Sequence, residues 1–160
     1  FKDMHGAAAP VVKFLLAGDG ELLEECRKLA DKLGVSNDIV FAGYRTDKKN
    51  ILQGSDLYVS PSKNEALSMS IIEALGSGLP VVATNVGGTS EIINDGNKCG
   101  VLIEYGDTEA FAREMLRFVQ DKAYYKSSSD NAFKTAGEKF NLDMTVQQTY
   151  NLYKLKKGDV

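Results

Sequence analysis

Apolar and polar positions alternate along the chain in short blocks that predict strands and helices in turn. The apolar block 11–17 ends in a glycine-rich turn, and residues 21–33 then carry apolar side chains at helical spacing. The further predicted strands are 39–43, 56–60, 79–84 and 100–103, and the further predicted helices are 46–54, one beginning near Ser68, one beginning near Glu91, 107–120, 123–137 and 143–156. This alternation favours a parallel sheet covered by helices on both faces.

Polar residues at the ends of these blocks predict where the helices begin. Thr108 is the expected cap of helix 107–120, and Thr89 or Ser90 is the expected cap of the helix near Glu91. Ser70, followed three residues later by Glu73, fits a capping box. The unbroken run from Ser68 favours an earlier helix start instead, which would place Glu73 in the second turn.

Small or polar loops follow four of the predicted strands. These loops are residues 18–20, 43–45, 61–68 and 85–88. In a parallel α/β sheet, ligands bind beyond the carboxyl ends of the strands, so we expect a ligand site at this edge. The Gly-Asp-Gly turn alone is a weak signal, because such a turn needs no ligand.

Composition and charge narrow the classes of function. The chain has 160 residues, 43% of them hydrophobic, and its net charge of −3 provides no basic field for nucleic acid. His5 is the only histidine, and Cys26 and Cys99 lie far apart, so neither a histidine-based catalytic triad nor a typical metal spacing is present. No apolar run approaches the roughly 20 residues that span a bilayer.

One stretch gives the pattern a more specific meaning. Residues 61–65, PSKNE, are followed after seven residues by 73–84, EALGSGLPVVAT. Together they resemble the signature of the C-terminal domain of retaining GT-B glycosyltransferases, the family-4 or "group 1" class. The resemblance extends from about Phe14 to Tyr153. Further segments that match the family in order are residues 14–20, 40–44, 55–60 and 87–93.

The resemblance implies an α/β fold with a Rossmann-like doubly wound parallel sheet, forming one nucleotide-sugar-binding domain over residues 1–160. The family's first strand and its N-terminal acceptor domain have no counterpart before Val11. We therefore expect this chain to lack both. Either preceding residues supply that strand, or its two neighbours, 11–17 and 56–60, close on each other or on a second copy.

The resemblance also implies roles for individual residues. Glu65 would face the transferred sugar at its reacting centre, and Glu73 would accept hydrogen bonds from the ribose hydroxyls. The backbone around the helix start would bind the diphosphate without a metal ion, through Ala66, Leu67, Ser68 and Met69. The nucleobase would lie near Gly18, Gly43, Tyr44 and Arg45. The family often has Gly-Phe-Gly where this chain has residues 66–68, Ala-Leu-Ser.

The function that follows from the resemblance is that of a retaining, metal-independent hexosyltransferase in polysaccharide or glycolipid assembly. Its donor would be a UDP- or GDP-linked sugar, with no cofactor, and its acceptor a glycan or a lipid-linked molecule. A cytoplasmic location is expected, with peripheral association at the inner face of the membrane as an alternative for the parent enzyme. This chain alone is expected to be inactive.

The same residues also bear on two other functions. A non-catalytic module that only binds a nucleotide sugar would retain the same fold. A Rossmann oxidoreductase is disfavoured, because Leu23 stands where the third glycine of the dinucleotide-binding motif belongs.

Overall fold

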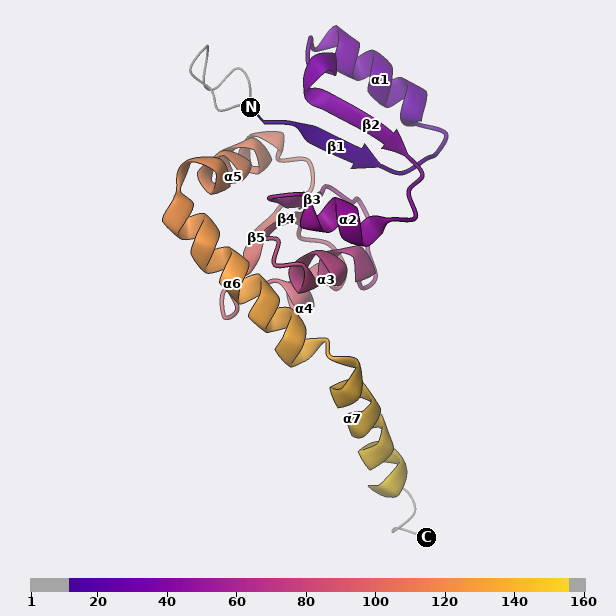
Figure 1. Ribbon diagram of the computed structural model, residues 1–160, viewed down its shortest axis with the longest axis vertical. Helices are drawn as coiled ribbons and strands as arrows, with labels where there is room; N and C mark the ends of the chain where they lie inside the picture. The colour runs from indigo at the N-terminus through magenta and orange to yellow at the C-terminus, as the bar shows by residue number, and fades with distance from the viewer. Residues whose placement is uncertain (1–11, 156–160) are drawn as a thin grey trace. The chain divides into compact units, whose positions relative to one another are not determined.

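Five parallel strands form two separate sheets in the computed structural model, which describes residues 12–155. Strands β1 and β2 belong to a unit that ends at Asn50, and β3, β4 and β5 belong to a unit that begins at Ile51 (Figure 1). Strands alternate with helices and every strand pair is parallel, so the predicted α/β pattern is confirmed. The single domain expected over residues 1–160 stays a prediction.

The first unit pairs two strands beside one helix. Its elements are β1 (Phe14–Ala17), α1 (Leu23–Lys32), the short 3-10 helix Ser36–Asp38 and β2 (Ile39–Gly43). Phe14 lies opposite Ile39 in the β1–β2 ladder. The guanidinium of Arg27 on α1 lies 4.5 Å from the centre of the Phe41 ring on β2, a cation–π contact that joins helix to sheet.

The second unit contains the larger sheet, in the order β3-β4-β5. Its strands are β3 (Tyr58–Ser60), β4 (Val81–Thr84) and β5 (Gly100–Ile103), and its helices are α3 (Met69–Gly76), α4 (Thr89–Ile92), α5 (Thr108–Gln120), α6 (Lys122–Lys139) and α7 (Leu142–Leu155). Helix α2 (Lys48–Gln53) crosses the boundary between the two units.

The predicted elements lie where expected, with differences of a few residues at their ends. Direct pairing of β1 with β3, one outcome expected for a sheet without its first strand, is not among the strand pairs of residues 12–155. Val11, the first residue of the predicted strand 11–17, lies outside the described residues.

The core of the second unit lies on the α3 and α6 side of β4. All four residues of β4 are buried, as expected for a strand covered on both faces. α3 packs against α6, and α5 packs against β4 and β5 (Figure 1). The buried residues that form this core are Ile71, Ala74, Leu75, Leu79, Val81, Ala83, Ile92, Ile93, Cys99 and Ala132.

Gly100 lets β5 approach β4 at the first position of their ladder. It pairs with Val81, and a Cβ atom at residue 100 would lie only 2.3 Å from the Val81 carbonyl oxygen. Real Cβ contacts are essentially never this short. A larger residue here would push the two strands apart, so the start of this strand requires glycine.

Two helix caps differ from the sequence prediction. Asp107, rather than Thr108, caps α5, and its carboxylate accepts a hydrogen bond from the backbone N–H of Ala110 at 2.9 Å. A carboxylate at this position also interacts favourably with the positive end of the helix dipole. Thr89 is the first residue of α4 and does not cap it, because Gly88 occupies the N-cap position.

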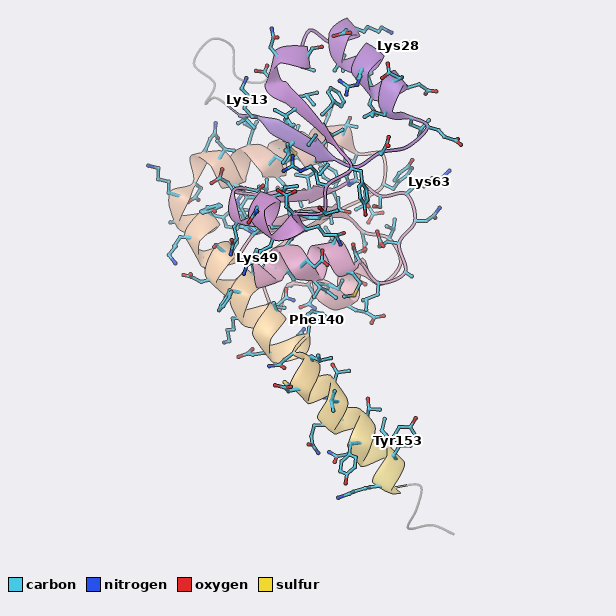
Figure 2. The ribbon with its side chains drawn as sticks, turned by 45° about the vertical axis from the view of Figure 1, so that its right-hand side comes forward. Lys13, Lys28, Lys49, Lys63, Phe140 and Tyr153 are labelled. Carbon is cyan, nitrogen blue, oxygen red and sulfur yellow. The ribbon has the colours of Figure 1, made fainter. Side chains whose placement is uncertain are left out.

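Helix α7 differs from the others in its exposure. Every described residue from Asn141 to Lys154 is exposed, including Leu142 at 75% and Tyr153 at 72%. Tyr153 extends from the helix away from the core of this unit (Figure 2). The apolar residues of α7 between Leu142 and Tyr153 are therefore not part of that core.

Candidate functional site

The loop between β3 and α3 carries the first group of predicted site residues. β3 ends at Ser60, and residues 61–68 lead from it to Met69, the first residue of α3. Glu65 is half-buried within this loop, whereas Leu67 and Met69 are exposed. The loop thus leaves the carboxyl end of a sheet strand and enters a helix N-terminus, which is where α/β proteins bind ligands.

The start of α3 has no side-chain cap. Ser68 is the N-cap residue and is buried, but its side chain makes no capping hydrogen bond, and its Oγ lies 3.0 Å from the Oγ of Ser70. The N–H of Ile72 donates to the carbonyl of Ser68 at 3.2 Å. The N–H groups of the three residues before Ile72 have no acceptor within the helix, and such groups favour an anion.

Glu73 lies in the second turn of the same helix. Counting from Met69, Ser70 is the second helical residue and Glu73 is the fifth. A capping box needs the serine at the N-cap and the glutamate at the third position, so that interpretation of the pair is wrong. The alternative, a helix start near Ser68 that places Glu73 in the second turn, is confirmed. The Glu73 side chain is exposed.

The turn after β4 holds the backbone of the Glu65 loop. The N–H of Gly88 donates to the carbonyl of Ala66 at 2.8 Å, and the hydroxyl of the buried Thr84 donates to the carbonyl of Ser62. The sequence placed residues 85–88 at the ligand edge but missed these contacts. A glycine pair signals a close approach, but it does not say which backbone comes close.

In the first unit, glycines bring the ends of the two strands together. The N–H of Gly18, just after β1, donates to the carbonyl of Gly43 at the end of β2, at 2.8 Å. Tyr44 follows and is 78% exposed. Gly18, Gly43 and Tyr44 therefore gather at the carboxyl edge of this small sheet, where the sequence analysis expected a nucleobase to bind.

Arg45 is held by Asp47, a residue for which the sequence predicted no role. Its Nε donates to Oδ1 of Asp47 at 2.7 Å and its Nη2 donates to Oδ2 at 2.6 Å, which makes a bidentate pair. The hydrogen bond to Asp47 raises the pKa of Arg45, and the same bond lowers the pKa of Asp47. The sequence signal for this pair was the spacing of Arg45 and Asp47, two residues apart, which by itself does not indicate an ion pair.

The structure therefore groups the selected residues in two sets, one in each unit. Residues 65–69 and Glu73 share one loop and helix in the second unit, while Gly18, Gly43, Tyr44 and Arg45 share one sheet edge in the first. The set in the second unit offers the carboxylates of Glu65 and Glu73 for hydroxyl groups, and the N–H groups of the first turn of α3 for an anion. Lys63 extends from the same loop as Glu65 and is exposed (Figure 2).

Two features are absent from the residues that the structure describes. Within residues 12–155, no three side chains of the His, Cys, Asp and Glu types gather in a way that could hold a metal ion. In that same range, no helix has both the length and the apolar character needed to cross a bilayer.

Comparison with known proteins assigns the family. The family model described as "Glycosyl transferases group 1" matches residues 1–139. The chain belongs to this family. Its fold matches C-terminal domains of GT-B enzymes in the same family, which confirms the resemblance found in the sequence.

Two relatives in the group 1 family show how much of such a protein this chain covers. The lipopolysaccharide core biosynthesis glycosyltransferase LpsE of Rhizobium meliloti (strain 1021) is 34% identical over 135 residues, which are 84% of this chain and 39% of LpsE. The putative glycosyltransferase EpsD of Bacillus subtilis (strain 168) is 32% identical over 144 residues, 90% of this chain and 37% of EpsD. The chain therefore spans well under half the length of these relatives.

A solved member of the fold has been captured with ligands. Anabaena HepE in complex with UDP superposes with a TM-score of 0.86 and 26% identity, covering 91% of this chain and 42% of HepE. HepE in complex with UDP-glucose superposes with a TM-score of 0.82 and 27% identity, again covering 91% of this chain and 42% of HepE.

Proposed function

We propose that this chain is the donor-binding part of a retaining glycosyltransferase that transfers a sugar from a nucleoside diphosphate to a glycan or lipid-linked acceptor. One observation carries the proposal. Glu65 and Glu73 stand on either side of the uncapped N-terminus of α3, at the carboxyl end of β3. This arrangement supports a phosphate bound at the helix start, with one carboxylate before it and one after it in the sequence to accept hydrogen bonds from hydroxyl groups.

Three parts of a nucleotide sugar have a proposed counterpart in this arrangement: the diphosphate, the ribose and the transferred sugar. Backbone N–H groups of residues 66–69, which lead into the start of α3, bind the diphosphate, because the positive end of the helix dipole favours negative charge. Glu73 accepts hydrogen bonds from the two ribose hydroxyls, since a carboxylate offers two oxygens and a full charge. Glu65 contacts the transferred sugar and stabilises positive charge that develops at its anomeric carbon.

The edge of the first unit is the proposed site for the base. Tyr44 provides an exposed ring, and Gly18 and Gly43 leave the backbone open to a flat ligand. Arg45 would contact the base while it stays paired with Asp47, whose carboxylate fixes the direction of the guanidinium. UDP is the preferred nucleotide, because HepE, with the same fold, was solved with UDP and with UDP-glucose.

We also propose that these residues do not transfer sugar alone, because the chain covers only 39% of LpsE and 37% of EpsD. The acceptor would bind to the remainder of such a protein. LpsE is named for lipopolysaccharide core biosynthesis, which supports a lipid-linked or glycan acceptor.

A thermal-shift panel tests the nucleotide preference. The chain is heated with UDP, UDP-glucose, GDP, GDP-mannose and ADP, with and without EDTA. A ligand that binds only the folded state raises the melting temperature by mass action. We expect stabilisation by UDP and UDP-glucose that EDTA does not remove. If the melting temperature with each nucleotide at millimolar concentration equalled that of the chain without ligand, the proposal would be rejected.

The alternative, a non-catalytic nucleotide-sugar-binding module, gives the same thermal shifts. It is separated by assaying the full-length protein for sugar transfer and for slow hydrolysis of UDP-glucose. Donor binding without either reaction favours the module. The presence of a carboxylate at Glu65, beyond the groups needed for the nucleotide, favours the enzyme.

A further inference from the structure

The turn after β4 approaches the Glu65 loop more closely than any side chain would allow. A Cβ atom at Gly87 would lie 1.6 Å from the carbonyl oxygen of Glu65, and one at Gly88 would lie 2.4 Å from the carbonyl oxygen of Ala66. Cβ contacts below 3.0 Å are essentially never seen. Both obstructing atoms are backbone, so the loop itself would have to move.

Hydrogen bonds fix the same two segments to each other. The N–H of Gly88 donates to the carbonyl of Ala66 at 2.8 Å. One residue further on, the hydroxyl of Thr89 donates to the carbonyl of Thr84 at 3.0 Å and accepts from the N–H of Val86, also at 3.0 Å. Thr84 and Thr89 are each only 2% exposed, so the turn is held rigidly at the end of β4.

We propose that Gly87 and Gly88 are positioning residues for Glu65 and the start of α3, a role that rests on the proposed function of that segment. Both glycines contact the backbone of the Glu65 loop. Because neither has a side chain, the loop can lie against the turn at the end of β4. A side chain at either residue displaces the peptides of residues 65–66. Because α3 begins three residues later, the displacement reaches both the carboxylate and the proposed phosphate site.

The chain provides variants that separate close approach from backbone strain. Gly88 has a φ of −82°, so Gly88→Ala adds the steric contact without forcing a left-handed backbone. Gly106 has a φ of +91° and no atom within 4 Å of its Cβ position, so Gly106→Ala adds strain without a contact. Gly87, with a φ of +53°, combines both effects.

The experiment compares backbone amide spectra and UDP binding in the 160-residue chain. For Gly88→Ala we expect displaced amide resonances in residues 65–69 and a loss of UDP affinity of at least tenfold. For Gly106→Ala we expect resonances in 65–69 and an affinity for UDP that match the parent chain, even where the melting temperature falls. A Gly88→Ala chain that folds and keeps both the 65–69 resonances and the UDP affinity within twofold would overturn the proposal.

A second variant covers the case in which Gly88→Ala does not fold. Thr84→Val removes the hydroxyl that donates to the Ser62 carbonyl at the base of the same loop, and Thr84→Ser restores a hydroxyl there. For Thr84→Val we expect weaker UDP binding and shifted amide resonances in residues 65–69. For Thr84→Ser we expect both the UDP affinity and the resonances to return to those of the parent chain. Unchanged resonances in Thr84→Val would contradict the positioning role. If the parent chain binds no UDP, the proposed function fails, and the resonances alone still decide whether this turn positions the loop.

Discussion

The backbone N–H of Gly18 donates to the carbonyl of Gly43 across 2.8 Å and closes the carboxyl edge of the β1–β2 sheet. Gly18 has a φ of +150° and Gly43 a φ of +62°, both in regions that side chains disfavour. The edge therefore depends on two residues without a Cβ atom, although the space around each is open.

Gly43→Ala should lower the free energy of unfolding by about 1 to 2 kcal/mol, the cost of a left-handed backbone for a residue with a Cβ atom. Denaturant unfolding measures it. Gly20→Ala is the matched control, because Gly20 also has open space but no left-handed φ. A similar loss in both variants would show that the backbone angle at Gly43 is not the cause.

Glu73→Gln should weaken UDP binding by roughly 1 to 3 kcal/mol, because it removes the charge from the proposed acceptor of the ribose hydroxyls. Calorimetric titration with UDP measures the change. Glu109→Gln is the control, since Glu109 is also an exposed glutamate near the start of a helix. A lower melting temperature with an unchanged dissociation constant would mean that Glu73 supports only the helix.

Glu65→Gln in the full-length protein should depress the turnover number more than it raises the donor dissociation constant. The charge of Glu65 is proposed to act mainly where positive charge develops, in the transition state. Steady-state kinetics combined with donor binding separates the two effects. Equal losses in binding and in kcat/KM, with kcat unchanged, would assign Glu65 to donor binding alone.

Asp121→Ala should destabilise the second unit by about 1 kcal/mol, the usual cost of losing an N-cap. The Asp121 carboxylate accepts from the N–H of Tyr124 at 2.8 Å at the start of α6. Asp130→Ala on the same helix is the control, because it removes only an exposed ion pair with Lys126. Equal effects in thermal unfolding would argue against the cap.

The two cysteines should differ sharply in reactivity. Burial raises the pKa of the Cys99 thiol above its ordinary value of 9.0, whereas Cys26 is exposed. A thiol reagent at pH 8 should modify Cys26 in the native chain and Cys99 only after unfolding. The stability contributed by the buried neutral thiol is complete below pH 9.0 and is lost as the pH rises through the raised pKa. Rapid native labelling of Cys99 would contradict this.

The sequence predicted the order of elements because hydrophobic period and glycine stops are local signals. It predicted β5 at 100–103 without error, and it found the approximate start of α3 from the unbroken run after Ser68. It missed Asp107 as a cap because Asp107 and Thr108 are both good N-cap residues, and only the backbone angles decide between them.

The candidate site was predictable only in part. The pairing of Arg45 with Asp47 depends on a loop conformation that spacing does not reveal. The approach of Gly87 to Glu65 joins residues 22 positions apart, and it follows from the ladder between β3 and β4 rather than from either segment alone. Contacts of this kind require the tertiary fold.

The exposure of α7 from Leu142 to Lys154 has a consequence for how unfolding will be observed. A helix of 14 residues whose described residues are all exposed is near the lower limit of length for stability in water, so its amides should exchange with solvent through frequent local opening. Amides of β4, all buried, should exchange only through global opening. On heating, far-ultraviolet circular dichroism should therefore lose intensity gradually before the cooperative transition, and that sloping baseline will report the melting of α7.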